Sequence, residues 1–179
     1  MPGFSSNHAP VRHREPPVMP RAKPDQQHLR SACRYIELGM FDEAQAELEK
    51  IDPFCRDLPD LLAARIPHYR ALEKWDLMAI VAKKLTEWLP EMPENFIDWA
   101  YATRRAESID AAHAILTRAA SLHPTDPTIQ FYLGCHEVQM GHLDRAKAHL
   151  KRAAEVDVKF KLMALKEPDL ELLWSSLAN

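Results

Sequence analysis

Glycine, cysteine and long apolar runs are all scarce in this sequence. Only four glycines occur among 179 residues, and none stands in a GxxxxGK or GxGxxG phosphate loop. The three cysteines, Cys33, Cys55 and Cys135, are widely spaced without a CxxC pair, which favours reduced thiols over a disulfide framework. No apolar run reaches the roughly 18 residues of a membrane-spanning helix, and residues 1–30 lack the apolar centre of a secretory signal. We therefore expect a cytoplasmic chain without a membrane segment.

Signatures of catalysis and of metal binding are also missing. The nine histidines form no HExxH motif, no pair at i and i+4 and no zinc spacing with cysteine. His142 and His149 lie seven residues apart, which is more typical of a solvated helix face than of a metal site. Cys135 and His136 are adjacent, so on a helix they point about 100° apart and cannot pair as nucleophile and base. We expect no enzyme, no cofactor and no metal.

Charge is spread too thinly to indicate a nucleic-acid partner. The net charge is -3, and the body of the chain is mildly acidic. Residues 1–24 are weakly basic, hold six of the fourteen prolines and contain hardly any periodic apolar residues. Such a segment cannot bury enough apolar surface to offset the entropy of ordering. The sequence predicts a disordered arm over 1–24, with docking of its few cations on an acidic partner or nucleic acid as the weaker alternative.

A period of thirty-four residues runs through the rest of the chain. Rows of that length cover 25–58, 59–92, 93–126 and 127 to 158 or 160, with no insertion or deletion between them. The eighteenth residue of every row is an aspartate: Asp42, Asp76, Asp110 and Asp144. Such self-similarity predicts stacked copies of one structural unit.

Each row has the pattern of two helices. In the last row the apolar residues recur at helical spacing rather than alternating as in a strand. These residues are Ile129, Leu133 and Val138 for the first helix and Leu143, Ala146, Leu150 and Ala153 for the second. Prolines in LPEMPEN and HPTDPT fall at or near the first turn of the first helix in rows three and four. The sequence therefore predicts an all-α protein.

Four stretches carry a family pattern: LG at 133–134, GMFDEAQAELEK at 39–50, SIDAAHAILTRAASLHP at 108–124 and GHLDRAKAHLKRAAEVD at 141–157. This pattern resembles the tetratricopeptide repeat family over residues 25–158. The resemblance implies a right-handed superhelical solenoid of four antiparallel helix pairs. The positions that it assigns to close packing and to turns are Gly39, Ala44, Ala100, Ala112, Ala119, Gly134, Gly141, Ala146 and Ala153.

The glycines of the last row have different expected roles. Glycine costs roughly 0.5–1 kcal/mol against alanine inside a helix, so each needs a physical reason. Gly134 stands where the two helices of the fourth pair approach closely, facing Ala146 and Ala153. Gly141, like Gly39, stands where the chain reverses after the first helix and a positive φ is needed.

The second row departs from the pattern. Its close-packing positions hold the large residues Ile66, Met78 and Leu85, and Pro67 stands in the middle of the first helix. Proline there removes a backbone donor, so we expect a kink near Arg65. The bend either makes room for the larger side chains or reshapes the surface for a ligand. Two charged residues, Arg65 and Glu137, occupy apolar positions of the pattern and must reach water or a charged partner.

A last helix is predicted within residues 161–179. Pro168 suits its first turn, and an apolar stripe follows at i, i+3, i+4 and i+7. The stripe consists of Leu170, Leu173, Trp174 and Leu177. We expect it to cap the open end of the solenoid against the second helix of the fourth pair. The alternative is that it docks on a second copy and forms a homodimer.

The family resemblance places a ligand groove on the first helix of each pair. The residues that it would expose there are Leu29, Cys33, Ile36, Arg70, Ile97, Tyr101, Arg104, Arg105, Phe131, Tyr132 and Val138. Family members that bind chaperone C-termini use a clamp of lysine, asparagine and arginine. The matching positions here hold Leu29, Cys33, Ala64, Glu94 and Asp98, so that clamp is absent.

These residues favour recognition of another protein over catalysis. Aromatic residues and arginine dominate the energy of many interfaces, and the predicted groove holds both. We interpret the chain as a non-enzymatic scaffold or adaptor that binds a protein or peptide segment in its groove. The alternatives are a self-associating module and a substrate-specific chaperone similar to the tetratricopeptide chaperones of bacterial secretion.

Overall fold

The computed structural model describes residues 22–173, apart from the side chains of Asp169 and Leu172. Most of the predicted arm over 1–24, and Trp174 and Leu177 of the predicted C-terminal stripe, lie outside the described residues. Within 22–173 the chain forms helices and no strand. The all-α fold class is therefore confirmed.

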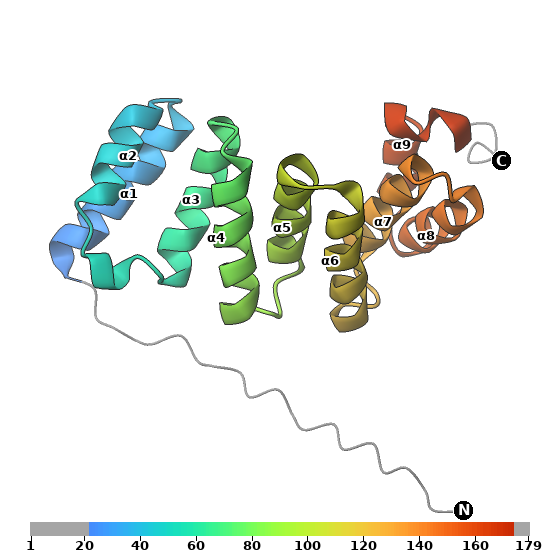
Figure 1. Cartoon of the computed structure of the whole chain (residues 1–179), viewed down its shortest axis with the longest axis horizontal. Helices are drawn as coiled ribbons and strands as arrows, with labels where there is room; N and C mark the ends of the chain where they lie inside the picture. The colour runs from blue at the N-terminus through green and yellow to red at the C-terminus, as the bar shows by residue number, and fades with distance from the viewer. Residues whose placement is uncertain (1–21, 174–179) are drawn as a thin grey trace, which may run out of the picture.

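The helices form four antiparallel pairs that stand side by side in a row (Figure 1). The pairs are α1 (Lys23–Glu37) with α2 (Phe41–Glu49), α3 (Pro59–Ala71) with α4 (Trp75–Trp88), α5 (Pro93–Ala106) with α6 (Ile109–Leu122), and α7 (Pro127–Gln139) with α8 (Leu143–Val156). The short 3-10 helix η1 (Pro53–Cys55) links the first pair to the second. Consecutive pairs contact each other, so the row is a solenoid. In the described part of the chain, no helix is both long and apolar enough to cross a membrane.

Helix boundaries follow local sequence signals. Proline occupies the first turn of α3, α5 and α7, where its missing N–H would have had no partner within the helix. Asp126 caps α7 by accepting a hydrogen bond from the Ile129 N–H at 2.8 Å. Ser108 caps α6 by accepting from the Ala111 N–H at 3.1 Å. Each cap satisfies a backbone donor that a helix leaves unpaired at its start.

The turn inside a pair uses a left-handed residue in three of the four pairs. Gly39 and Gly141 have φ angles of 73° and 81°, which cost little without a Cβ atom. Glu73 stands at the same position of the second row as Gly39 in the first. It takes a φ of 53° although it has a Cβ atom. That conformation is uncommon for residues other than glycine. The second pair therefore carries local backbone strain that the first and fourth pairs avoid.

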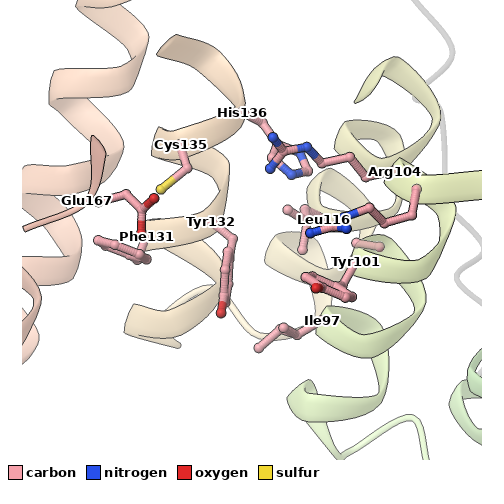
Figure 2. A pocket seen from close by; sticks show the side chains of 11 residues that line it. Ile97, Tyr101, Arg104, Leu116, Phe131, Tyr132, Cys135, His136 and Glu167 are labelled. Carbon is pink, nitrogen blue, oxygen red and sulfur yellow. The ribbon is translucent and has the colours of Figure 1, made fainter. Parts of the chain in front are cut away.

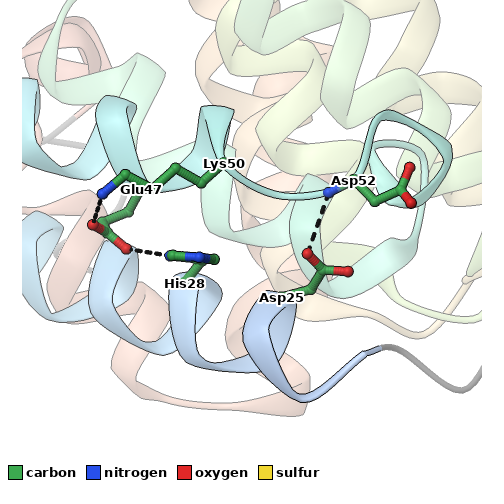
Figure 3. A network of polar contacts seen from close by, with 5 residues as sticks. All are labelled: Asp25, His28, Glu47, Lys50 and Asp52. Carbon is green, nitrogen blue, oxygen red and sulfur yellow. Dashed lines mark hydrogen bonds and ion pairs between the residues drawn. The ribbon is translucent and has the colours of Figure 1, made fainter.

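Polar contacts join α1 to α2 and to the segment that follows (Figure 3). His28 Nδ1 lies 2.7 Å from Glu47 Oε2, and Lys50 Nζ donates to Glu47 Oε1 at 2.6 Å. The hydrogen bonds from Lys50 and then from His28 hold the pKa of Glu47 below its ordinary value. The Asp52 N–H donates to Asp25 Oδ1 at 3.3 Å, which fixes the first turn of α1 against the chain beyond α2.

Buried apolar side chains form four clusters along the row. Each cluster spans one helix pair and the element that follows it, so a pair completes its core only with its neighbour. From the first pair to the fourth, a fully buried representative of each cluster is Leu48, Met78, Phe96 and Leu170. The core is therefore divided along the chain rather than concentrated in one centre.

Small residues at the positions predicted for close packing are buried in the helix pairs. The buried ones are Ala44, Ala100, Ala112, Ala119, Gly134, Ala146 and Ala153. A Cβ atom added at Gly134 would lie 2.7 Å from Leu150 Cγ and 3.4 Å from the Ala146 carbonyl oxygen. The first distance is far below van der Waals contact, so the packing of the Leu150 side chain against α7 favours glycine at this position.

The second pair accommodates larger side chains in the same places. Ile66, Met78 and Leu85 are all buried, and α3 continues through Pro67 to Ala71. The kink expected near Arg65 stays a prediction. Arg65 itself is half-buried.

The C-terminal part differs from the single helix that the sequence predicts over 161–179. The structure has a short helix, α9 (Lys159–Ala164), and then the 3-10 helix η2 (Pro168–Leu173). A break between them is consistent with Pro168, because proline disfavours the helical conformation of the residue before it. Two short elements can also turn and follow the end of the solenoid more closely than one straight helix can.

The C-terminal elements pack on the fourth pair in a different place from the one predicted. Leu170 and Leu173 are 0% and 1% exposed, and they share a cluster with residues of both α7 and α8. The prediction placed this stripe against the second helix, α8, only. The structure instead places η2 mainly against α7, while α9 contacts both α7 and α8, so the C-terminal segment covers one end of the face formed by the first helices.

Candidate functional site

A cavity of about 480 Å³ lies between α5 and α7, the first helices of the third and fourth pairs (Figure 2). Its lining combines aromatic, cationic and aliphatic side chains. The lining residues are Ile97, Ala100, Tyr101, Arg104, Arg105, Leu116, Phe131, Tyr132, Cys135, His136 and Glu167. A volume of this size is within the range of sites that take small ligands or a few side chains.

Helical spacing and one small residue create the cavity. On α5, Ile97, Tyr101 and Arg105 follow each other at intervals of four and lie on one face. Tyr132 and His136 have the same relation on α7. Ala100 is 2% exposed and belongs to the close packing of α5 with α6, so it adds little bulk to the lining. Larger side chains therefore form the walls and leave space between the two helices.

The ring of Tyr101 is in contact with two guanidinium groups. The Cζ atoms of Arg70 and Arg105 lie 5.1 Å and 5.2 Å from its centroid. Arg105 is also 5.2 Å from the ring centroid of Trp75, which meets Tyr101 edge to face at 5.6 Å. Cation–π contacts of this kind contribute roughly 0.5–2 kcal/mol each. They fix the positions of both arginines on the side of α5 that borders the cavity.

Arg70 has an acidic partner in the neighbouring pair. Its Nη2 donates to Asp98 Oδ1, which joins α3 to α5. Burial raises the pKa of Asp98 above its ordinary value, although the charge and hydrogen bond of Arg70 act in the opposite direction. Asp98 is one of the acids that replace cations of the chaperone clamp. The structure shows that it pairs with a residue of this chain.

His136 is a buried histidine in the wall of the cavity. It is 4% exposed, and its Nδ1 atom has no hydrogen-bond partner among the described residues. Burial, followed by the charges of Arg104 and His113, lowers its pKa from 6.5 to about 4. Figure 2 shows Arg104 and His136 extending toward each other from α5 and α7. At neutral pH the imidazole is therefore uncharged beside a cationic side chain.

We expect the stability of the protein to fall on acidification through His136. Between its unfolded pKa of 6.5 and its folded pKa of about 4, the unfolded chain binds a proton that the folded chain does not. Stability is therefore lost as the pH falls through this window, by about 2 kcal/mol between pH 7.5 and pH 5. Urea unfolding of the wild type and of His136→Gln at both pH values measures this difference.

The pH comparison has an internal control. The pKa values of His68 and His149 are also lowered by burial, and both residues are present in the wild type and in the variant. Only the difference between the two proteins reports His136. An equal loss of stability in both would contradict the assignment.

The cysteines are free thiols that are partly or fully buried. Cys135 is buried in the cluster of the fourth pair and also reaches the cavity wall. Cys33 is half-buried, and burial, with the charges of Glu37 and Asp60, raises the pKa of its thiol. Across the described part of the chain, no three His, Cys, Asp or Glu residues are grouped so that they could hold a metal ion.

The structure brings together about half of the predicted groove residues. Those that line the cavity are Ile97, Tyr101, Arg104, Arg105, Phe131 and Tyr132. Arg70 lies beside the cavity through its contact with Tyr101. Leu29, Cys33 and Ile36 are half-buried on α1, at the other end of the row. Phe131 and Val138 are 3% and 5% exposed in the core, so little of either reaches the surface.

Several residues of the site were not predicted. Trp75 fixes Arg105 from the turn of the second pair, and Leu116 closes the cavity from α6. Glu167 enters from the C-terminal segment, whose path the repeat does not define. His136 could have been found, because it follows the predicted groove residue Tyr132 by four residues on the same helix.

Glu137, the charged residue at an apolar position of α7, is buried beside two histidines. It is 3% exposed, and its Oε2 atom lies 2.7 Å from His142 Nδ1. Its Oε1 atom lies 3.4 Å from His113 Nε2 on α6. The carboxylate thus connects the third and fourth pairs outside the lining of the cavity.

Comparisons with known proteins identify the fold. No protein-family model and no curated protein matches the chain. Several solved structures are similar in shape, and MamA, YrrB and TTC0263 are three of them. A structure of MamA protein matches with a TM-score of 0.71 and 16% identity, over 87% of this chain and 86% of that one. YrrB, described as a TPR protein with an unusual peptide-binding site, matches with a TM-score of 0.63 and 16% identity, over 85% and 77%.

The third similar structure is TTC0263, described as a thermophilic TPR protein in Thermus thermophilus. It matches with a TM-score of 0.58 and 17% identity, over 86% of this chain and 98% of that one. At these identities the likeness concerns the fold. It confirms the tetratricopeptide repeat solenoid that the sequence resembles.

Proposed function

We propose that this chain is a protein-interaction scaffold that holds a segment of another protein between α5 and α7. The observation that carries the proposal is the cavity of about 480 Å³, whose walls present Ile97, Tyr132 and two arginines. Aromatic residues and arginine are the side chains that most often dominate the energy of an interface. A cavity between helices with apolar walls and a few polar groups suits side chains of a bound segment.

The similar fold of YrrB supports the proposal in a limited way. YrrB is described as having an unusual peptide-binding site, and the same fold in this chain carries a cavity between adjacent first helices. The binding residues proposed for this chain come from its own cavity. They have a binding role and no catalytic role in this proposal. The location that we propose for the protein is the cytoplasm.

Self-association through the C-terminal stripe receives less support. That alternative needs Leu170 and Leu173 at the surface, and both are buried against the chain's own fourth pair. The remaining stripe residues, Trp174 and Leu177, lie outside the described residues. The alternative of a secretion-type chaperone rests on the family resemblance and on no further contact in the structure.

Selection of peptides from a random display library tests the proposal. We expect the full-length protein to enrich peptides that then bind Ile97→Asn about ten times more weakly. The amide would replace apolar contact worth roughly 1–2 kcal/mol with a polar group that lacks a partner. Isothermal titration with the enriched peptides gives the dissociation constants.

Ile80→Asn is the matched control for this substitution. Ile80 lies on α4, is 64% exposed and does not line the cavity, so the same chemical change there should leave affinity unaltered. Thermal unfolding of both variants shows whether the fold is kept. The proposal fails if no peptide is enriched, or if the two variants bind the enriched peptides equally well.

A further inference from the structure

Two arginines flank Tyr101, and they differ in one respect. Arg70 stacks on the ring and also pairs with Asp98. Arg105 stacks on the same ring at nearly the same distance but forms no ion pair with any residue in 22–173 whose side chain is described. Among the described side chains, a carboxylate therefore pairs with the guanidinium group of Arg70 and none pairs with that of Arg105.

Arg105 is held in position despite its exposure. Its guanidinium lies 5.2 Å from the ring centroids of both Trp75 and Tyr101, so two aromatic contacts restrict its rotamers. It also stands in the last turn of α5, where the helix dipole favours a cation. A side chain that is ordered before binding loses less entropy when a ligand arrives. The planar guanidinium keeps its N–H groups at the edge, where they can donate two parallel bonds to a carboxylate.

The charges around the cavity favour an anion at the α5 wall. That wall contributes Arg104 and Arg105, and the acidic lining residue is Glu167. Figure 2 shows Glu167 beside Phe131 and Cys135, across the cavity from Arg104. An incoming carboxylate would therefore be attracted to the α5 wall and repelled from the opposite side. Glu73 and Asp76 line a neighbouring hollow that Arg105 also borders, but neither forms an ion pair with it.

We propose that the bound segment presents a carboxylate to Arg105 and places a neighbouring apolar side chain in the cavity between α5 and α7. This inference rests on the proposed function, because it names the chemistry of the segment that the same cavity would hold. The carboxylate completes at Arg105 the arrangement that Asp98 completes at Arg70. Ile97 and Tyr132 receive the apolar side chain.

A double-mutant cycle on the enriched peptides tests the contact. We expect these peptides to contain an aspartate or glutamate next to a large apolar residue. Replacing that acid by its amide, or Arg105 by glutamine, should each weaken binding about tenfold or more, as for hydrogen bonds between charged groups. The two changes together should cost little more than either alone. If Arg105 acted only by positioning Tyr101, the two losses would instead multiply.

Further variants separate charge from geometry and from fold. Arg105→Lys keeps the charge but loses the planar fork, so we expect it to recover only part of the affinity. Arg118→Gln removes the same charge from an exposed position on α6 and should leave binding unchanged. Amidation of the peptide C-terminus distinguishes an acidic side chain from a terminal carboxylate. It weakens binding only if the C-terminal carboxylate is the group that contacts Arg105.

The outcomes separate this inference from the proposed function. Peptides that depend on Ile97 but lack an acid, or that bind Arg105→Gln as tightly as the wild type, would overturn the inference and leave the scaffold proposal standing. Additive losses in the cycle would overturn it as well. If no peptide is enriched, both proposals fail.

Discussion

Replacement of Leu170 and Leu173 by alanine is expected to lower the free energy of unfolding of the fourth pair by about 3–6 kcal/mol. Both side chains are essentially inaccessible to solvent, in a cluster with Phe131, Val138 and Phe160. A single buried leucine costs about 2–5 kcal/mol when it is truncated, and neighbouring truncations are not fully additive. Urea unfolding followed by circular dichroism measures the loss.

The expected loss has a consequence for the candidate site. Phe131 belongs both to this cluster and to the cavity lining, and Glu167 precedes η2 directly. Loosening of η2 would therefore expose part of α7 and displace one wall of the cavity. We expect faster amide hydrogen exchange in α7 in the double variant than in the wild type.

Leu162→Ala is the control for the C-terminal substitutions. Leu162 lies on α9 with 58% exposure, so its truncation should change stability by no more than about 0.5 kcal/mol. An equal effect of the exposed and the buried replacements would show that the C-terminal segment does not pack as described. Conversion of an oligomer to a monomer by the buried pair, at unchanged stability, would instead support self-association through this segment.

Substitution of Gly134 by valine is expected to destabilise the protein by about 2–3 kcal/mol. Helix propensity alone predicts the opposite sign, because most residues are better helix formers than glycine. Packing decides the outcome here, since the first added carbon would already meet Leu150 Cγ at 2.7 Å. Leu150 is 3% exposed and cannot swing into solvent. Overpacking of this kind typically costs 1–3 kcal/mol, and valine adds two more methyl groups.

A second substitution tests whether the contact with Leu150 is the cause. We expect Gly134→Val combined with Leu150→Ala to be less destabilised than the sum of the two single variants by about 1 kcal/mol or more, because space is created where it is needed. Strict additivity in denaturant unfolding would mean that the strain at Gly134 has another origin. A single variant Gly134→Val as stable as the wild type would contradict the close approach altogether.

The repeat was predictable because its signal is local. Side-chain bulk recurs every thirty-four residues, and small residues such as Ala112 and Ala146 identify the positions where paired helices meet. Gly134 was assigned to close packing only because it stands at a position where the repeat pattern has a small residue. The nearest atoms nevertheless belong to Leu150 rather than to the small residues facing it, because the approach depends on rotamers that a sequence does not encode directly.

The candidate site was less predictable because it depends on contacts between pairs. Arg70 and Asp98 are twenty-eight residues apart. The sequence placed Arg70 in the groove and Asp98 at a clamp position, but no sequence pattern indicated that the two side chains form an ion pair. Phe131 has the spacing of a groove residue, yet Phe160, Leu170 and Leu173 cover it. These three residues lie on α9 and η2, which follow the fourth pair. The repeat pattern does not extend over these two elements, so it could not predict where they pack.

The division of the core into four clusters determines how the chain should respond to denaturant. Each cluster joins only adjacent elements, so energetic coupling weakens with distance along the row, as in a one-dimensional chain of interacting units. The cluster at the N-terminal end is built from few side chains, among them Ala32 and Cys55. The solenoid can therefore fray from its N-terminal end while the middle stays folded. Of the two helices that border the cavity, α5 belongs to the interior of the row, whereas α7 belongs to the last pair and depends on the C-terminal elements that cover it.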